Sequence, residues 1–166
     1  VTLNGFGEAS EIERIRADLA ERTGVAVRHS GADMSKGDQV MAMVREAEAA
    51  HGSVDILVNN AGIQHVAKVE DFPVDKWDAI IAINLSSAFH ATRLALPAMK
   101  AANWGRIINV ASVHGLVASA EKSAYVAAKH GVVGLTKVTA LENAANGVTC
   151  NAICPGWVLT PLVQKQ

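Results

Sequence analysis

The stretch Val54-Asp55-Ile56-Leu57-Val58-Asn59-Asn60-Ala61-Gly62 decides the fold class of this 166-residue chain. After a Gly-Ser break, its first five residues form a mainly apolar run, which is typical of a parallel strand buried on both faces. Strand-like and helix-like segments alternate on both sides of this run. We expect strands at 1–4, 25–29, 54–58, 106–111 and 147–153, and helices at 8–23, 36–51, 73–102 and 124–146. This order predicts an α/β fold with a parallel sheet and right-handed crossovers.

Proline and glycine mark irregular points in the two long helices. Pro97 predicts a kink or a break near it, because its nitrogen has no hydrogen to donate. Gly131 and Gly134 lower the helix propensity of 124–146 but would let a neighbouring element approach closely. Small residues on these helices, such as Ala91, fit either contact with the sheet or contact with a partner subunit.

Composition and charge argue against several classes of protein. Half of the residues are apolar, 19% are charged and the formal net charge is −1, so we expect a core and no extended disorder. The near-neutral balance argues against a basic nucleic-acid binder and a polybasic membrane patch. There is no apolar run of about 18 residues, and Val1–Asn4 has no basic start typical of a signal peptide. We therefore expect a cytoplasmic protein without nucleic-acid or membrane partners.

Cysteine and histidine are too few and too scattered for a disulfide framework or a metal site. Cys150 and Cys154 would lie on one face of a strand, too far apart along it to bridge, and they fit small core residues in a reducing compartment. The six histidines have no metal-ligand spacing, so we expect no metal.

The loop Asn4-Gly5-Phe6-Gly7 has a Gly-x-Gly pattern between a strand and a helix, as in dinucleotide-binding loops. Ser10 stands where that pattern needs a third glycine, and the following helix begins with Glu8, Glu11 and Glu13. Acidic side chains at a helix N-terminus would repel a pyrophosphate. An ordinary loop at the end of a strand is the favoured interpretation.

Three residues predict acid–base chemistry at the end of a strand. Tyr125 and Lys129 are four positions apart on an expected helix, so their side chains share one face. A phenol with a pKa of about 10 is a poor base at neutral pH, and a neighbouring ammonium lowers that pKa. Ser112 ends the strand 106–111, where its hydroxyl could hold a substrate oxygen. A Tyr-x-x-x-Lys pair alone is more often a surface pair, but here it follows a strand-end serine by 13 residues.

These residues, with three further motifs, resemble the short-chain dehydrogenase/reductase family. The motifs in order are Asn59-Asn60-Ala61-Gly62, Asn84 in the stretch 84–89, Ser112, Tyr125-Val126-Ala127-Ala128-Lys129 and Pro155-Gly156-Trp157-Val158-Leu159-Thr160. The resemblance covers essentially the whole chain and implies a Rossmann-type, doubly wound parallel sheet with helices on both faces. It also implies hydride transfer between a nicotinamide cofactor and a secondary alcohol or ketone, and a homo-oligomer, a dimer or tetramer, formed through the two long helices.

The resemblance gives catalytic roles to four residues. It implies that Tyr125 is the general acid and base, that Lys129 lowers its pKa and bonds the nicotinamide ribose, and that Ser112 orients the substrate oxygen. It implies that Asn84 holds a water that extends a proton relay from Lys129. As a bare residue, Asn84 could instead be an amide that kinks the helix.

The resemblance also implies which residues bind the cofactor. Asp33 would bond the adenine amino group, although it also fits an N-cap of the helix that starts at Lys36. The loop Asn4–Gly7 has no cation for a 2′-phosphate, which favours NAD over NADP. The implied cofactor-binding set is Phe6, Asp33, Met34, Asn60, Ala61, Gly62, Tyr125, Lys129, Pro155, Gly156, Val158 and Thr160.

Cationic and donor side chains near Ser112 and Tyr125 favour a small anionic substrate, a hydroxy acid or its keto acid. His114 lies two residues after Ser112 and Lys122 three before Tyr125, and each also fits an ordinary polar loop residue. Further similarity to family members that act on such acids implies the substrate-binding set Gln64, Ser112, His114, Lys122, Tyr125, Trp157 and Gln166. The alternatives are a dehydrogenase of another small hydroxy acid or secondary alcohol, and a non-catalytic binding protein.

The glycine-rich phosphate loop of the family, Thr-Gly-x-x-x-Gly-x-Gly, does not occur in the sequence. In the family that loop follows the central strand, so we expect the first and last strands of the fold to be absent from residues 1–166. We interpret the chain as the internal portion of one longer NAD-binding and catalytic domain. Strands at 1–4 and 25–29 should then fail to pair with the strand at 54–58, and the span alone should fold poorly and bind NAD weakly.

Overall fold

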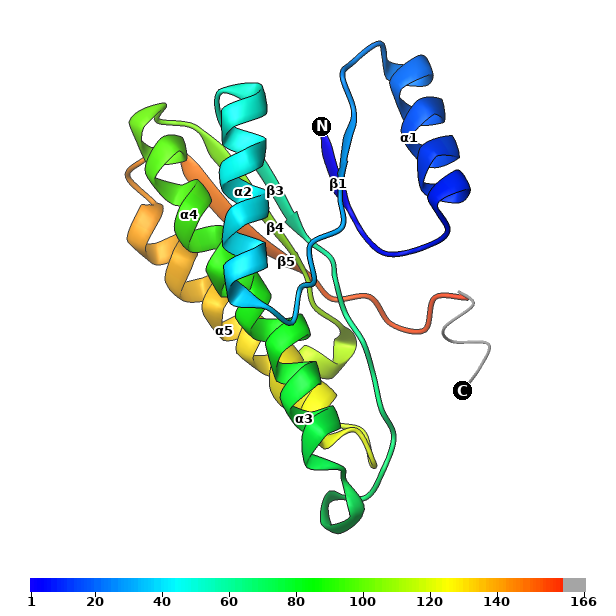
Figure 1. Ribbon diagram of the computed structural model, residues 1–166. Coiled ribbons are helices and arrows are strands. Elements are labelled where there is room, and N and C mark those ends of the chain that lie inside the picture. The colour runs from blue at the N-terminus through cyan, green and yellow to red at the C-terminus, as the bar shows by residue number, and fades with distance from the viewer. Residues whose placement is uncertain (160–166) are drawn as a thin grey trace.

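The computed structural model describes residues 1–159, in which parallel strands alternate with helices (Figure 1). The strands are β1 (Thr2–Asn4), β2 (Arg28–Ser30), β3 (Ile56–Asn59), β4 (Gly105–Val110) and β5 (Val148–Ile153). The helices are α1 (Ala9–Thr23), α2 (Gly37–His51), α3 (Val74–Ile81), α4 (Ser87–Ala101) and α5 (Ser123–Asn143). Shorter turns are the 3-10 turns η1 (Val69–Asp71) and η3 (Val113–Gly115) and the π-helical turn η2 (Ala82–Ser86). The expected α/β class with parallel strands is confirmed.

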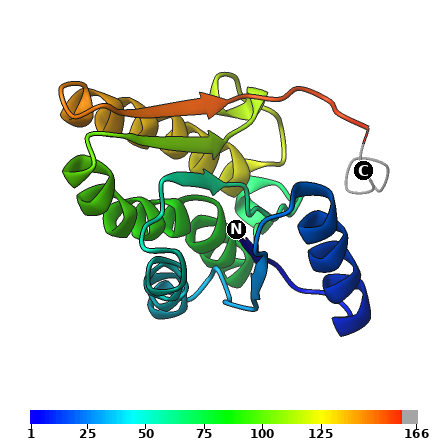
Figure 2. The same ribbon diagram turned by 90° about the horizontal axis from the view of Figure 1, so that it is seen from above.

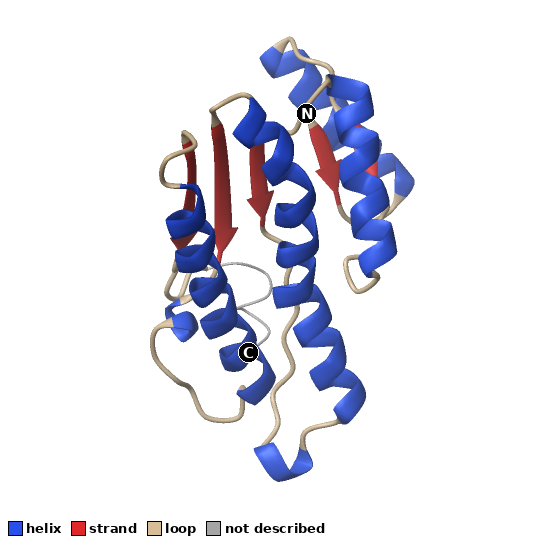
Figure 3. Cartoon of the chain, turned by 90° about the vertical axis from the view of Figure 1, so that its left-hand side faces the viewer, coloured by secondary structure: helices blue, strands red, loops and turns tan. Residues whose placement is uncertain are grey.

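The strands form two separate parallel sheets, β1–β2 and β3–β4–β5 (Figure 3). In the larger sheet, Ile107 on β4 pairs with Leu57 on β3 and with Cys150 on β5. A cavity of about 860 Å³ separates the two sheets, and Val1–Asn4 and Val54–Ala61 contribute to its lining. The expectation that the first two strands do not pair with β3 is confirmed, because a cavity and not a hydrogen-bonded ladder lies between them.

Helices α2, α4 and α5 lie on one side of the larger sheet (Figures 1 and 2). The core beneath them includes Ile107 and Met99, which are 0% and 1% exposed. Alternate strand residues point to this face, as the two-residue period of a strand requires. On the opposite face, Ile56, Val58 and Ile153 are each more than half exposed. Within residues 1–159, the helices therefore bury one face of the larger sheet.

The helical stretch from Val74 to Ala101 is irregular at η2 and not at Pro97. Helix α4 continues through Pro97, because Ala95 and Met99 on either side of it are anchored in the core. The helix therefore does not break at Pro97, a kink there stays a prediction, and the irregular turn lies earlier in the stretch.

The stretch α3–η2–α4 is long and apolar enough, by length and composition alone, to cross a membrane. Its most apolar window has a mean hydropathy of 1.3, and 39% of that window is buried inside the protein. This is weak evidence for a membrane span, because a core helix of a soluble protein meets the same criteria.

The two glycines of α5 have different surroundings. A Cβ added to Gly131 would lie 2.8 Å from Cδ2 of Leu85 in η2, so this glycine permits the close approach that the sequence predicts. A Cβ added to Gly134 would meet nothing within 4 Å among residues 1–159, so no element in this part of the chain makes the close approach predicted there.

Candidate functional site

The segments that follow β4 and β5 stay paired beyond the ends of their strands. The Ala111 N–H donates to the Ile153 carbonyl at 2.8 Å, and the Val113 N–H donates to the Pro155 carbonyl at 2.8 Å. Ser112 therefore lies between two backbone hydrogen bonds that fix its position. It lies at the carboxyl edge of the sheet, which is where open parallel sheets bind ligands.

Ser112 also caps the turn η3, which packs against α5. Its Oγ accepts a hydrogen bond from the His114 N–H at 3.1 Å, and the residue is 8% exposed. Gly115 ends the turn, and a Cβ added there would lie only 2.8 Å from the backbone oxygen of Lys129. Because glycine has no Cβ, it permits this approach, and the turn holds Ser112 beside the helix that carries Tyr125 and Lys129.

Lys129 is buried on α5, with 4% of the residue exposed. Its Nζ donates to the Val110 carbonyl at the end of β4 at 2.7 Å and lies 5.6 Å from the ring centroid of Tyr125. Burial lowers the pKa of Lys129 to about 8, so the side chain is still mainly an ammonium at neutral pH. A positive charge beside a phenol favours the phenolate, which is the form that accepts a proton.

Asn84 lies in the π-helical turn η2 and is 3% exposed. Its Oδ1 accepts from the Ile63 N–H and its Nδ2 donates to the Ile63 carbonyl, both at 2.9 Å. A Cβ added to Gly62 would lie 3.7 Å from both Asn84 Oδ1 and Lys129 Nζ, so these groups meet at one place. This geometry gives Asn84 the structural role of anchoring the segment after β3, and its role in a water relay stays a prediction.

Part of the predicted cofactor-binding set lies around the large cavity. Met34, Asn60 and Ala61 line it, together with Asn84 and Val110. Lys129 donates one hydrogen bond, and its other N–H groups have no protein acceptor within residues 1–159. Free donors on a buried ammonium fit the hydroxyls of a ribose, so Lys129, which does not line the large cavity, fits the ribose of a nicotinamide cofactor.

Asp33 lies in the turn that precedes α2. Its Oδ1 accepts from the Ser35 N–H at 2.8 Å, and hydrogen bonds from Ser35 hold the pKa of the Asp33 carboxyl below its usual value. The N-cap of α2 is Lys36, and no side chain caps this helix. The N-cap alternative for Asp33 is therefore wrong, because its carboxylate is already used to brace the turn.

The loop after β1 is an ordinary strand-end loop, as the sequence favours. The Asn4 Nδ2 donates to the Ser30 and Ala32 carbonyls at 3.0 and 2.9 Å, which ties the loop to the end of β2. Phe6 in this loop is 74% exposed. The other predicted cofactor-binding residues are Gly62 beside Asn84, and Pro155, Gly156 and Val158 after β5, whereas Thr160 lies outside the described residues.

The predicted substrate-binding residues come from segments that meet near Tyr125. Lys122 directly precedes α5, is 8% exposed, and forms an isolated parallel bridge with Ala67. Its Nζ lies 5.0 Å from the ring centroid of Trp157, and the His114 ring lies 6.3 Å from the Tyr125 ring in an edge-on orientation. The structure thus brings a buried cation and two aromatic rings to the start of α5. Gln166, also predicted here, lies outside the described residues.

Two buried polar atoms of the predicted substrate set have no hydrogen-bond partner within residues 1–159. They are Gln64 Nε2 and His114 Nδ1. Native proteins rarely leave buried polar groups unpaired, because each loses its hydration without replacement. These atoms therefore indicate a place for a polar ligand.

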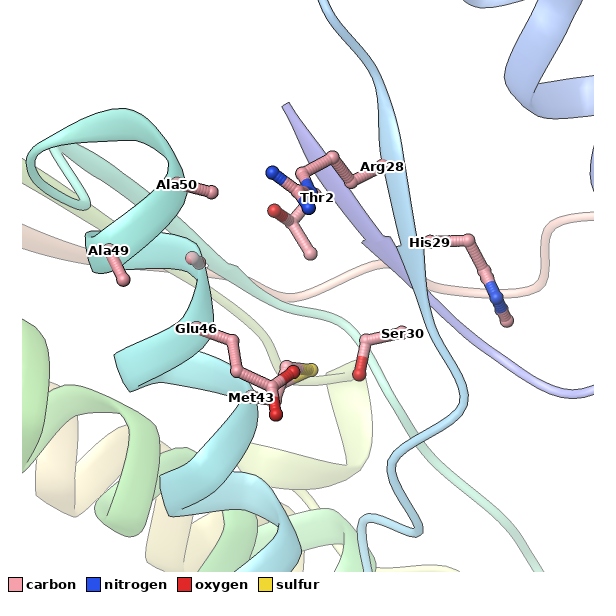
Figure 4. Close-up of a pocket in the computed structure, with 9 residues that line it drawn as sticks. Thr2, Arg28, His29, Ser30, Met43, Glu46, Ala49 and Ala50 are labelled. Atoms are coloured by element: carbon pink, nitrogen blue, oxygen red, sulfur yellow. The ribbon is translucent and has the colours of Figure 1, made fainter.

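A second hollow of about 450 Å³ lies between the β1–β2 sheet and α2 (Figure 4). Its lining comes from the two strands and the second half of α2, namely Thr2, Arg28, His29, Ser30, Met43, Glu46, Ala47, Ala49 and Ala50. It contains no residue predicted to bind cofactor or substrate.

The structure describes both cysteines and all possible clusters of metal-ligand side chains up to residue 159. Cys150 and Cys154 are both free thiols, and burial raises the pKa of Cys150. Within residues 1–159, no group of three or more His, Cys, Asp or Glu side chains could hold a metal ion.

Comparison with family models shows that residues 6–166 match the model of short chain dehydrogenase. The chain belongs to the short-chain dehydrogenase family. Two curated relatives of this short-chain dehydrogenase are named D-beta-hydroxybutyrate dehydrogenase. The one from Cupriavidus necator is 67% identical over 167 residues, and the one from Rhizobium meliloti is 58% identical over 166 residues. Both alignments cover 100% of this chain, which spans 64% of each relative's length.

A solved structure supports the fold of this short-chain dehydrogenase. It is described as a putative short-chain alcohol dehydrogenase from Sinorhizobium meliloti and is 33% identical, with a TM-score of 0.88. The match covers 96% of this chain and 63% of that one. The Rossmann-like arrangement that the sequence predicts is therefore confirmed.

Proposed function

We propose that this short-chain dehydrogenase interconverts (R)-3-hydroxybutyrate and acetoacetate with NAD. The observation that carries the proposal is the set of buried polar groups around the candidate site. Lys122 supplies a cation, and Gln64 Nε2 and His114 Nδ1 are buried without partners within residues 1–159. Such groups fit a carboxylate. The printed names of the relatives at 67% and 58% identity support the choice of acid.

The chain's own residues supply the proton transfer in this proposal. In oxidation, the Tyr125 phenolate accepts the proton of the substrate hydroxyl, and in reduction the phenol returns it. The Lys129 ammonium, 5.6 Å from the Tyr125 ring centroid, stabilises the phenolate. A bound nicotinamide cofactor would accept the hydride in oxidation and supply it in reduction.

Ser112 holds the reacting oxygen. Its Oγ already accepts a hydrogen bond from the His114 N–H, so its own hydrogen is available to the oxygen that becomes the carbonyl. A donor aimed at that oxygen stabilises the charge that develops on it during reduction.

NAD is proposed over NADP because the loop Asn4–Gly7 carries no Lys or Arg that could pair with a 2′-phosphate. Met34, Asn60 and Ala61 would lie along the adenosine half of the cofactor. Lys129 would bond the nicotinamide ribose with the N–H groups that Val110 leaves free.

A cytoplasmic homo-oligomer formed through the long helices is part of the same proposal. Phe89 on α4 and Val138 and Leu141 on α5 are 47%, 52% and 79% exposed, and a partner subunit would cover such apolar side chains. Light scattering on the natural full-length protein should give a multiple of the subunit mass. The mass of one subunit would contradict this part of the proposal.

The test is the rate of NADH formation by the natural full-length protein with each enantiomer of 3-hydroxybutyrate. We expect the (R) acid with NAD to react about 100-fold faster than the (S) acid, because the carboxylate and hydroxyl must both be bound. NADP in place of NAD should slow the reaction. Failure to oxidise either enantiomer, or a preference for uncharged secondary alcohols, would overturn the proposal.

A further inference from the structure

A chain of four side chains crosses the core below the candidate site, linking two helices through two strands. Asn59 on β3 donates from Nδ2 to Asn109 Oδ1 on β4 at 2.8 Å and to Thr92 Oγ1 on α4 at 3.4 Å. Asn109 donates from Nδ2 to Thr136 Oγ1 on α5 at 2.8 Å. The Thr136 hydroxyl in turn donates to the Val132 carbonyl at 2.8 Å. We call Thr92–Asn59–Asn109–Thr136 the polar chain.

Three members of the polar chain are buried, whereas Asn59 is partly exposed and lines the large cavity. Thr92, Asn109 and Thr136 are 4%, 1% and 6% exposed. Ile107, which lies two residues before Asn109 on the same face of β4, is completely buried. Apolar residues would fill this level of the core without any need for hydrogen-bond partners. Hydrogen bonds in the core can fix the relative position of helices and strands, because they form in only one register of the packed elements.

Each member of the polar chain lies at a short, fixed distance along the sequence from a residue of the site. Asn59 and Asn109 each precede a site residue, Gly62 and Ser112, by three positions. These offsets place both asparagines at the same level below the carboxyl edge of the sheet. They also occupy paired positions in the β3–β4 ladder.

The two threonines stand in the same relation to the helical site residues. Thr136 follows Lys129 by seven positions on α5, and Thr92 follows Asn84 by eight positions along η2 and α4. Both separations are about two helical turns, so each threonine lies two turns below its site residue. The polar chain therefore ties together all four segments that carry Gly62, Asn84, Ser112 and Lys129.

We propose that the polar chain is a positioning element that holds α5 in register with β4 and so places the Lys129 ammonium between Val110 and Tyr125. Among the described residues, two side-chain hydrogen bonds supplement the apolar packing of α5 on the end of β4, the Lys129–Val110 bond at 2.7 Å and the Asn109–Thr136 bond at 2.8 Å. Without the second, α5 can shift while the first stretches. The members of the chain act through Lys129 and touch neither substrate nor cofactor.

The experiment compares Thr136→Val, Thr136→Ser and Thr139→Val in the natural full-length protein. Valine keeps the shape of Thr136 and removes its hydroxyl, whereas serine keeps the hydroxyl. Thr139 is the matched control, because it is 4% exposed on the same helix and takes no part in the polar chain. The primary readout is the titration of the Lys129 side chain by NMR with labelled lysine, which does not require turnover.

We expect Thr136→Val to raise the pKa of Lys129 by about half a unit, because a displaced ammonium regains water. In Thr136→Ser and Thr139→Val, Lys129 should have the same pKa as in the wild type. If Thr136→Val does not fold, Thr92→Val removes the longest bond of the chain and should produce a smaller shift in the same direction. An unchanged titration in the folded variant, or an equal shift in Thr139→Val, would overturn the proposal.

Turnover gives a second readout, which rests on the proposed function. Thr136→Val should lower kcat about tenfold with KM little changed, because misplacement affects the reacting groups more than substrate binding. If the wild type oxidises no hydroxy acid, the proposed function fails, and the Lys129 titration still decides the positioning proposal.

Discussion

Helices α1 and α5 are both expected from the sequence, but they have opposite surroundings. Helix α1 has no buried residue, and its cations form exposed ion pairs with acids three or four positions away, such as Arg14 with Glu11. Helix α5 has eight buried residues, including Lys129, and the buried Lys122 directly precedes it.

The difference comes from the strands on which the two helices pack. Helix α5 lies on β4 and β5, and β4 has a paired strand on each side. Helix α1 contacts β2, a three-residue strand whose only partner is β1 within residues 1–159. A periodic sequence can thus form a helix in both places, but burial requires a sheet. Exposed ion pairs contribute little to stability, whereas the buried ammonium of Lys129 loses hydration and so destabilises the fold.

The largest expected contrast is in stability. Ile107→Ala on β4 removes a completely buried side chain and should lower the free energy of unfolding by about 3 kcal/mol. Ile15→Ala on α1 removes a side chain that is 45% exposed in this span of residues and should change the free energy of unfolding of the span by less than about 0.5 kcal/mol. Chemical denaturation of the two variants measures both effects. Equal losses would show that the α1 region is as tightly packed as the β3–β4–β5 sheet.

The next contrast is between buried and exposed cations. Lys122→Met should raise KM for the hydroxy acid about 100-fold, because it removes a buried charge that would pair with the carboxylate. Arg14→Met is the control, because the Arg14–Glu11 pair is exposed on α1, and it should leave KM unchanged. Steady-state kinetics measures KM for the hydroxy acid in both variants. A KM for Lys122→Met that equals the wild-type value would remove Lys122 from the substrate site.

Lys129→Met tests whether the buried ammonium destabilises the fold. The ordinary lysine pKa of 10.5 falls to about 8 in the folded protein, so the unfolded chain binds the proton more strongly. The free-energy cost of burying the Lys129 ammonium is therefore fully present below about pH 8. It decreases as the pH rises from about 8 to about 10.5.

Near pH 7 we expect Lys129→Met to be more stable than the wild type by about 2 kcal/mol. Lowering the pKa of Lys129 from 10.5 to about 8 costs the fold about 3 kcal/mol, and the lost bond to Val110 offsets about 1 kcal/mol of the gain. Thermal or chemical unfolding at several pH values measures the gain, which should disappear above about pH 10. A variant that is less stable than the wild type at neutral pH would contradict this account of Lys129.

The order of strands and helices could be predicted because it follows from local periodicity. The start of β2 could not be predicted, because it depends on pairing with β1. Thr2 on β1 pairs with Arg28, so β2 covers Arg28–Ser30 and not the expected 25–29. The irregular turn η2 lies where the sequence offers Asn84 as an amide that kinks the helix, but the partner of that amide could not be predicted. The Asn84 side chain there pairs with the backbone of Ile63, which a search for proline or glycine cannot find.

In the candidate site, sequence reasoning finds side chains and misses backbone groups. Ser112, Tyr125 and Lys129 have recognisable chemistry at a recognisable spacing. The Val110 carbonyl that holds Lys129 has no signal in the sequence, because every residue has a carbonyl. Gly115 has a weak signal, since it is a glycine three positions after Ser112, but only the structure shows its close approach to Lys129.

The most direct test of the account is the turnover of Tyr125→Phe in the natural full-length protein. Tyr125 is the only tyrosine among the 166 residues, so no other phenol of this chain can replace it. We expect kcat with (R)-3-hydroxybutyrate and NAD to fall at least about 1000-fold, because the general base is lost. NADH binding, followed by its fluorescence, should be nearly unchanged, because phenylalanine keeps the ring. A rate within about tenfold of the wild type would contradict the claim that Tyr125 transfers the proton.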